Sequence, residues 1–192
     1  MCKSLILASA SPRRQQLLSQ LGLKFSVEPS NLDEDLNLKM EFGPYAASLA
    51  LKKAMAVAKK HQKGLVLGAD TIVVLDDKIL GKPHTFEEAQ EMLTSLSGRW
   101  HRVFTGLSLV DASTKRYVSD FEESRVKFKE LSSLEIQNYI KTGEPMDKAG
   151  AYGIQGKGAL FVEKIEGDYY NIVGLPLFRL SKMLAQFDIK VL

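Results

Sequence analysis

Residues 64–75 read GLVLGADTIVVL, which is the strongest strand pattern in the chain. Aliphatic and β-branched residues follow one another here, so both faces of the strand are expected to be buried. A strand covered on both sides is typical of an α/β layer arrangement. We therefore predict an α/β fold organised around this strand.

One carboxylate, Asp70, interrupts this apolar run. An isolated buried charge is very costly, so the side chain must be paired, protonated or bound to a metal ion. A structural partner, such as a backbone N–H group or an arginine, would satisfy it. Because buried carboxylates gather at functional sites, we favour a functional role for Asp70.

Shorter patterns predict the elements around the central strand. The expected helices cover residues 12–21, 44–60, 85–96, 132–143 and 176–187, and the further strands 5–8, 24–28, 100–110, 116–129 and 159–165. The helix at 44–60 has a narrow face of small residues, which indicates a closely packed neighbour. Two long strands at 100–129 predict an antiparallel hairpin and therefore a mixed sheet. No linker or repeat divides the chain, so residues 1–192 are expected to form a single domain.

The composition is that of an ordinary soluble globular protein, with 45% hydrophobic and 26% charged residues among 192. The net charge of +3 arises from 26 basic and 23 acidic residues that are intermixed, which is too balanced to indicate nucleic-acid binding. A single cysteine, Cys2, excludes an intrachain disulfide. The longest apolar run contains Asp70 and cannot span a bilayer. We expect a cytoplasmic protein with no membrane or nucleic-acid partner.

A candidate anion site lies near the N-terminus, where the first expected strand ends in Ser9 and Ser11. Pro12 suits the first position of a helix, so Arg13 and Arg14 should fall in its first turn. Cations at the positive end of a helix require a counter-charge that the helix does not supply, and a phosphate would supply it. The alternative is that one arginine pairs with a neighbouring carboxylate and the other is solvated.

Further candidates are scattered along the chain. Lys53 lies on the alanine-rich helix, and Lys82 lies in a loop tightened by glycine and proline. Glu34 belongs to an acidic stretch that is either a solvated loop or a metal-binding one. Gln155 lies in a glycine-rich stretch that is either a plain cluster of turns or a loop against a ligand. Clustered cations with carboxylates favour phosphoryl chemistry, in which carboxylates hold Mg²⁺ or Mn²⁺.

The three histidines support no competing site. No Ser-His-Asp arrangement is evident, because His61, His84 and His101 lie in or near polar stretches. We expect all three at the surface.

Four motifs together resemble the Maf family of nucleoside triphosphate pyrophosphatases. They are SASPRR (9–14), GADT (68–71), GKP (81–83) and DKAGAYGIQG (147–156), in the same order over nearly the whole chain. The resemblance implies cleavage between the α- and β-phosphates with a divalent cation. It also implies a fold similar to the inosine triphosphatase-like (Maf/Ham1) fold, with a long mixed sheet flanked by helices, two lobes and a central cleft. A homodimer is expected on the same ground.

The resemblance also suggests roles for individual residues. Asp70 is the expected proton acceptor and, with Glu34, a ligand of the Mg²⁺ or Mn²⁺ ion. Arg13, Thr71 and Gln155 match the branch that prefers dTTP and UTP to 7-methyl-GTP. The expected contacts to the triphosphate come from two serines and three cations, namely Ser9, Ser11, Arg14, Lys53 and Lys82.

One position departs from the family pattern. Many relatives carry Glu or Gln directly before the lysine of the alanine-rich helix, whereas this chain has Lys52. The metal-binding role therefore falls more heavily on Glu34 and Asp70. Three alternatives stay open. The first is a nucleotide-binding regulator of cell division without turnover, the second is a nucleic-acid module using the lysines of this helix, and the third is a pyrophosphatase with a different base preference, such as 7-methyl-GTP. The lysine face of the helix lacks stacking aromatic residues, which argues against the second alternative.

Overall fold

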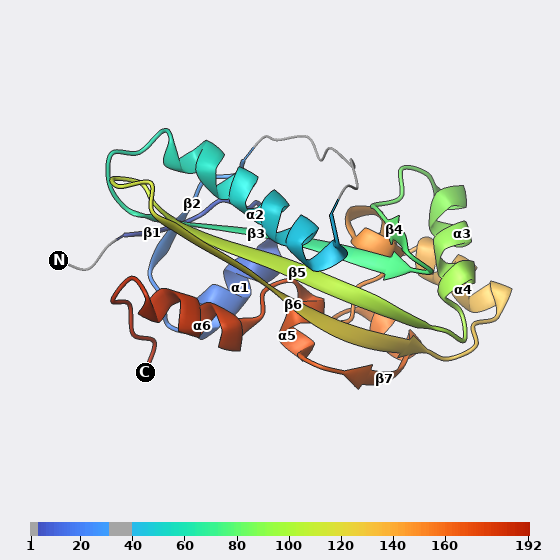
Figure 1. Cartoon of the computed structure of the whole chain (residues 1–192). Helices are drawn as coiled ribbons and strands as arrows, with labels where there is room; N and C mark the ends of the chain where they lie inside the picture. Colours follow the sequence, from blue (N-terminus) through green and yellow to red (C-terminus); the bar gives the residue numbers. More distant parts are fainter. Residues whose placement is uncertain (1–3, 31–39) are drawn as a thin grey trace. The chain divides into compact units, whose positions relative to one another are not determined.

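The computed structural model describes residues 4–30 and 40–192, and they form an α/β fold (Figure 1). The strands are β1 (Leu5–Leu7), β2 (Phe25–Val27), β3 (Leu65–Leu75), β4 (Lys78–Leu80), β5 (Trp100–Asp111), β6 (Tyr117–Phe128) and β7 (Val162–Glu166). The helices are α1 (Pro12–Gln20), α2 (Phe42–Ala58), α3 (Phe86–Leu96), α4 (Ser133–Ile140), α5 (Tyr169–Val173) and α6 (Leu177–Ala185). Three short 3-10 helices are η1 (Glu144–Asp147), η2 (Ala149–Ala151) and η3 (Lys157–Phe161). Among these helices, none is long and apolar enough to cross a membrane.

In the described part of the chain, the strands form one mixed sheet of seven strands, ordered β2-β1-β3-β5-β6-β7, with β4 paired to β3 outside this path. β1 runs parallel to both β2 and β3, and Leu7 lies opposite Val27 on one side and Leu67 on the other. β3 pairs antiparallel with β4, and β6 pairs antiparallel with β7. The strand at residues 65–75 therefore lies inside the sheet, and the predicted α/β class and mixed sheet are confirmed.

The chain divides into two compact units. Unit 1 comprises Met1–Asp70, Thr105–Glu122 and Gly174–Leu192, and unit 2 comprises Thr71–Phe104 and Glu123–Val173. Three strands, β3, β5 and β6, contribute residues to both units.

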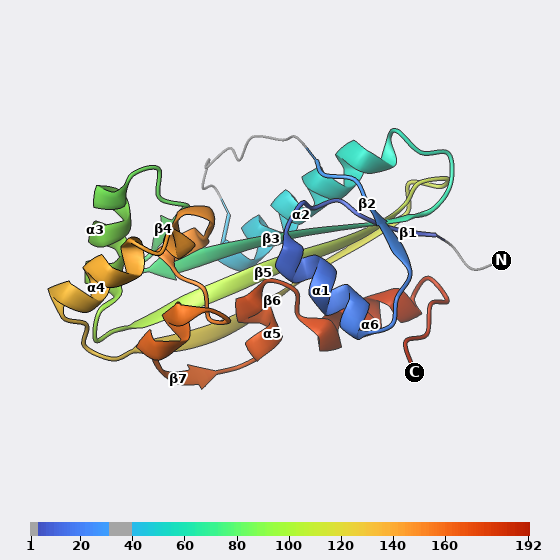
Figure 2. The ribbon, with the colours of Figure 1, turned by 180° about the vertical axis from the view of Figure 1, so that it is seen from behind.

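In unit 1, α2 covers one face of the sheet, and α1 and α6 cover the other (Figures 1 and 2). The small-residue face of α2 is fully buried and lies directly over two glycines of the sheet. A Cβ atom added to Gly68 would lie 2.1 Å from the carbonyl oxygen of Ala50, and one added to Gly106 would lie 2.2 Å from that of Ala46. The close neighbour predicted for this helix is therefore the backbone of β3 and β5.

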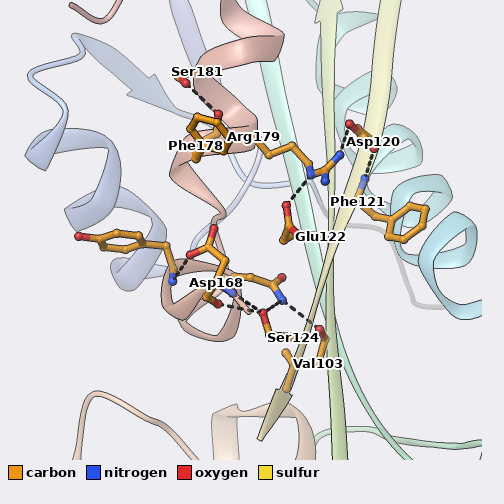
Figure 3. Close-up of polar contacts among 11 residues, drawn as sticks. Val103, Asp120, Phe121, Glu122, Ser124, Asp168, Phe178, Arg179 and Ser181 are labelled. Carbon is orange, nitrogen blue, oxygen red and sulfur yellow. Dashed lines mark hydrogen bonds and ion pairs between the residues drawn. The ribbon is translucent and has the colours of Figure 1, made fainter. Parts of the chain in front are cut away.

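An arginine fixes α6 to β6 within unit 1 (Figure 3). The guanidinium of Arg179 donates to Oε2 of Glu122 at 2.7 Å and also to Asp120. The two acceptors lie two residues apart on β6, so their side chains lie on the same face of the strand. One side chain on α6 thus meets two carboxylates of β6.

In unit 2, capping residues lie at the predicted starts of α3 and α4, residues 85 and 132. Ser132 and Glu135 form a complete capping box, in which each side chain accepts from the other residue's backbone N–H. Thr85 caps α3 by accepting from Glu88 N at 3.2 Å. The Glu88 carboxylate accepts from the backbone N–H of His84 at 2.7 Å. In a standard capping box it would accept from the N–H of the next residue, Thr85.

The segment before residue 174, for which the sequence patterns predicted no helix or strand, contains a helix. Residues Tyr169–Val173 form the short helix α5. The buried amide of Asn171 donates to Val103 O at 3.0 Å and to Ser124 Oγ at 2.8 Å. The Ser124 hydroxyl in turn donates to Asp168 O at 2.9 Å (Figure 3). These contacts join residues that are far apart in sequence, which explains why no local pattern predicted the helix.

The last strand begins later than predicted. Residues 159–161 belong to η3, and β7 begins only at Val162. The N–H of Ala159 donates to Gly156 O at 3.1 Å, so the glycine-rich stretch continues as a tight turn into this segment.

The prediction that His101 is at the surface is wrong. The residue is only 2% exposed and packs edge-on against the rings of Phe128 and Tyr152, with centroid distances of 4.9 and 5.3 Å. Its Nε2 lies 2.8 Å from the Tyr152 hydroxyl. Burial lowers the pKa of His101 to about 3, so the ring is neutral at pH 7. Successive side chains of a strand point to opposite faces, so His101 points inward. Its polar neighbours in the sequence were the reason for expecting it at the surface.

Candidate active site

The expected anion-binding segment forms a helix start, as the sequence predicts. Ser11 caps α1 with its hydroxyl 3.5 Å from Arg14 N, and Pro12 occupies the first turn. The guanidinium of Arg14 donates from Nε to Gly174 O at 2.9 Å and from Nη1 to Ser9 Oγ at 3.1 Å. Ser9, Ser11 and Arg14 are therefore held together in unit 1. The contact between Arg14 and the carbonyl of Gly174 could not be predicted from a local sequence pattern, because the two residues are 160 positions apart.

Asp70 is buried in β3 and forms an ion pair with Lys53 of α2. Both side chains are poorly accessible, with 4% exposure for Asp70 and 15% for Lys53. This pairing is possible because α2 packs closely against β3. Ala54, the residue directly after Lys53, lies next to Gly68 of the strand. Asp70 therefore has the partner that a buried carboxylate requires. This partner is Lys53, which we had expected to contact the triphosphate.

The strand that leads into the arginine site, β1, pairs directly with β3, the strand that carries Asp70. Leu7 pairs with Leu67, and Ala8 N donates to Leu67 O at 2.8 Å. Ser9 and Asp70 follow these residues on adjacent parallel segments that advance by about 3.3 Å per residue. Unit 1 thus holds two pairs of predicted site residues, Ser9–Arg14 after β1 and Lys53–Asp70 between α2 and β3.

Unit 2 holds three further candidates, Thr71, Lys82 and Gln155. Gly150 N donates to Gly81 O at 3.0 Å, so the glycine-rich stretch lies against the turn that carries Lys82. Lys82 and Gln155 are exposed, and Thr71 is half-buried on β3. Arg13, the other candidate for base choice, is half-buried in the first turn of α1 in unit 1. The predicted residues are thus divided between the two units.

The expected metal ligands are Asp70 and Glu34, and Glu34 lies outside the described residues. Within residues 4–30 and 40–192, no group of three or more His, Cys, Asp or Glu side chains has the arrangement of a metal site. Mg²⁺ is commonly held by one or two carboxylates together with substrate phosphates and water. The oxygen donor of Asp70 fits that mode of binding, in which the substrate supplies further ligands.

The structure also identifies a supporting cluster that the sequence reasoning missed. The Glu144 carboxylate accepts from Lys157 N at 3.0 Å and Gly158 N at 3.3 Å, and the Tyr139 hydroxyl donates to it at 2.8 Å. Partial burial alone would raise the pKa of Glu144, but these donors stabilise the carboxylate and hold its pKa below the usual value. The sequence indicated only a helix end near residue 144, because the two backbone donors to Glu144 lie 13 and 14 residues away.

Comparison with known proteins connects this arrangement to a family. A family model described as Maf-like protein matches residues 4–187. The chain belongs to the Maf family. Maf relatives include a dTTP/UTP pyrophosphatase from Thermoanaerobacter sp. (strain X514), 54% identical over 98% of this chain and 99% of the relative. Another dTTP/UTP pyrophosphatase, from Alkaliphilus oremlandii, is 52% identical over 99% of this chain and all of the relative.

A solved structure confirms the expected fold of this Maf chain. The structure of a HAM1 protein from Coxiella burnetii aligns with a TM-score of 0.54, covering 96% of this chain and 100% of that chain. At 16% identity this likeness shows the fold alone.

Proposed function

We propose that this Maf protein hydrolyses dTTP and UTP between the α- and β-phosphates, giving a nucleoside monophosphate and pyrophosphate. Relatives that carry this activity in their names share about half of their residues with the chain, at 54% and 52% identity. The observation that carries the proposal is the buried Lys53–Asp70 pair, whose strand β3 pairs with the strand that leads into the Ser9–Arg14 helix start. A carboxylate and fixed cations at one place are what phosphoryl transfer to water requires.

In this proposal Asp70 is the general base. It takes a proton from a water molecule whose oxygen attacks the α-phosphorus in line. The new P–O bond forms as the bond to the bridging β-oxygen breaks, and pyrophosphate leaves with that electron pair. The ammonium of Lys53 has three donors, so it can keep one on Asp70 while others reach a phosphate oxygen.

The other candidates take binding roles. Arg14, anchored by Gly174 O and Ser9, presents its remaining donors to a phosphate, and Lys82 contributes a second cation. Arg13, Thr71 and Gln155 contact the pyrimidine. Asp70 and Glu34 would hold a Mg²⁺ or Mn²⁺ ion, which neutralises charge on the phosphates when bound.

A substrate panel tests the proposal directly. The full chain is incubated with Mg²⁺ or Mn²⁺ and each canonical triphosphate, 7-methyl-GTP and modified pyrimidine triphosphates, with pyrophosphate and monophosphate measured separately. We expect both products in equal amounts, fastest from dTTP and UTP. Release of inorganic phosphate and a nucleoside diphosphate instead would contradict the assignment of the cleaved bond. Binding of triphosphates without any turnover would identify a nucleotide-binding regulator.

A further inference from the structure

Gln155 lies at the centre of a tight turn in unit 2. The turn spans Gly153–Gly156 and is closed by a hydrogen bond from Gly156 N to Gly153 O at 3.3 Å. Of the two central residues, Ile154 is buried with 8% exposure and Gln155 is exposed. The isoleucine therefore anchors the turn in the unit and the glutamine faces outward from it.

Two side chains hold this turn at both ends. The Tyr139 hydroxyl accepts from Gly153 N at 3.1 Å, at the first residue of the turn. The carboxylate of Glu144 accepts from the N–H groups of Lys157 and Gly158, directly after its last residue. Because Tyr139 also donates to Glu144, the two side chains join the two ends of the turn.

Gly156 leaves the space that the carboxylate needs. A Cβ atom at this position would lie 2.3 Å from Oε1 and 2.4 Å from Oε2 of Glu144. The φ of Gly156 is −102°, outside the left-handed region, so this glycine is required for space rather than for its backbone conformation. The absence of a side chain at residue 156 and the carboxylate at residue 144 thus form a matched pair.

We propose that Glu144 is a positioning residue that sets base selectivity by fixing the turn that carries Gln155. The inference rests on the proposed function, in which Gln155 contacts the pyrimidine. A glutamine amide presents an acceptor on one side and donors on the other. Uracil and cytosine differ in that O4 of the first is an acceptor and N4 of the second is a donor. An amide on a loosened turn can rotate to match either base, whereas a fixed turn favours one.

The test measures the ratio of kcat/KM for UTP to that for CTP on a single enzyme preparation. Glu144→Gln replaces one of the two acceptor oxygens with a donor. Gly156→Ala keeps the carboxylate but displaces it, because the added methyl group occupies its space. We expect each variant to lower the ratio about tenfold, the equivalent of one lost hydrogen-bond alignment. The ratio is independent of the fraction of active enzyme, so partial unfolding does not imitate the effect.

Two further variants complete the design. Glu163→Gln changes an exposed glutamate on β7 and should leave the ratio unchanged. Gln155→Ala should lower the ratio by itself, and adding Glu144→Gln to it should cause no further decrease, because Glu144 acts through Gln155.

The outcomes separate this inference from the proposed function. An unchanged ratio in both Glu144→Gln and Gly156→Ala overturns the inference and leaves hydrolysis intact. A further decrease when Glu144→Gln is added to Gln155→Ala also overturns it. Equal hydrolysis of UTP and CTP by the unmodified chain overturns the assignment of Gln155 and the inference with it. No hydrolysis of any triphosphate overturns the proposed function instead.

Discussion

Asp70 is the residue on which the proposed chemistry depends. Asp70→Asn keeps the size of the side chain and its acceptor toward Lys53 but removes the base. We expect pyrophosphate release to fall by about 10²- to 10⁴-fold, the usual contribution of general-base catalysis. The measurement is pyrophosphate release from dTTP and UTP, with circular dichroism to verify the fold. Asp77→Asn, an exposed aspartate in the turn after the same strand, is the matched control. Activity of Asp70→Asn near that of Asp77→Asn would disprove the base assignment.

Lys53 has a second role, in stability. Removing one partner of a buried ion pair leaves the other charge uncompensated, which costs about 3–5 kcal/mol. Lys53→Met should therefore lower the free energy of unfolding by roughly that amount in urea denaturation. Lys52→Met, a change at the exposed neighbouring position of α2, should change it little. Equal effects of the two substitutions would show that the ion pair contributes no stability.

His101 makes stability depend on pH. Its pKa is about 3 in the folded protein, against 6.5 for the free side chain. Above pH 6.5 the ring is neutral in both states and contributes no pH dependence. Below pH 6.5 the unfolded chain binds a proton that the folded protein does not, so stability falls by about 1.4 kcal/mol per pH unit down to pH 3.

The His101→Gln variant tests this slope. Between pH 7.5 and pH 5.0, the unmodified protein should lose about 2 kcal/mol more of its free energy of unfolding than the variant does. Denaturant midpoints at both pH values measure the difference. Parallel pH profiles for the two proteins would contradict the assignment of this effect to His101.

Single residues were predictable where chemistry made them conspicuous in the sequence. Asp70 interrupts an apolar run, and Ser11 followed by Pro12 is a recognisable helix start, so both could be identified. Their partners could not, because the Lys53–Asp70 and Arg14–Gly174 contacts depend on how elements pack. Glu144 carries no local pattern that separates a supporting carboxylate from a solvated one.

At the scale of elements, the placement of α2 on the sheet is the feature most open to test. Gly68→Ala would place a methyl group 2.1 Å from Ala50 O and so push the helix away from β3. Overpacking of this kind costs about 1–3 kcal/mol. Displacement of α2 should also lower activity, because Lys53 lies on this helix.

The comparison is with Gly81→Ala, where an added Cβ meets nothing within 4 Å. Urea denaturation of both variants should show a lower midpoint for Gly68→Ala and little change for Gly81→Ala. Equal midpoints would mean that the helix adjusts at no cost.

Elements were predictable in proportion to the strength of their local patterns. The alanine face of α2 indicated a close neighbour, since small residues at helical spacing allow close approach, but it did not identify Gly68 and Gly106 as that neighbour. The helix α5 was missed because its five residues are stabilised through Asn171 and Ser124, which contact strands distant in sequence.

At the scale of the whole molecule, the three strands shared by both units predict cooperative unfolding. β3, β5 and β6 are continuous through both units, so loss of either unit frays the same strands. We expect one transition, with the fluorescence of Trp100, the single tryptophan, and far-ultraviolet circular dichroism following the same denaturant curve. Separate midpoints for the two probes would show that unit 2, which contains Trp100, unfolds independently.

The hydrogen bond from Arg14 to Gly174 also has a consequence for synthesis of the chain on the ribosome. The two residues are 160 positions apart, so the arginine is made long before the carbonyl that orients it. At about 5–20 residues per second, that interval is on the order of ten to thirty seconds. During this time the nascent chain carries the cation without its anchor. The proposed phosphate site is therefore completed only after Gly174 has been made, and nascent chains that stop before this residue should not consume nucleotides.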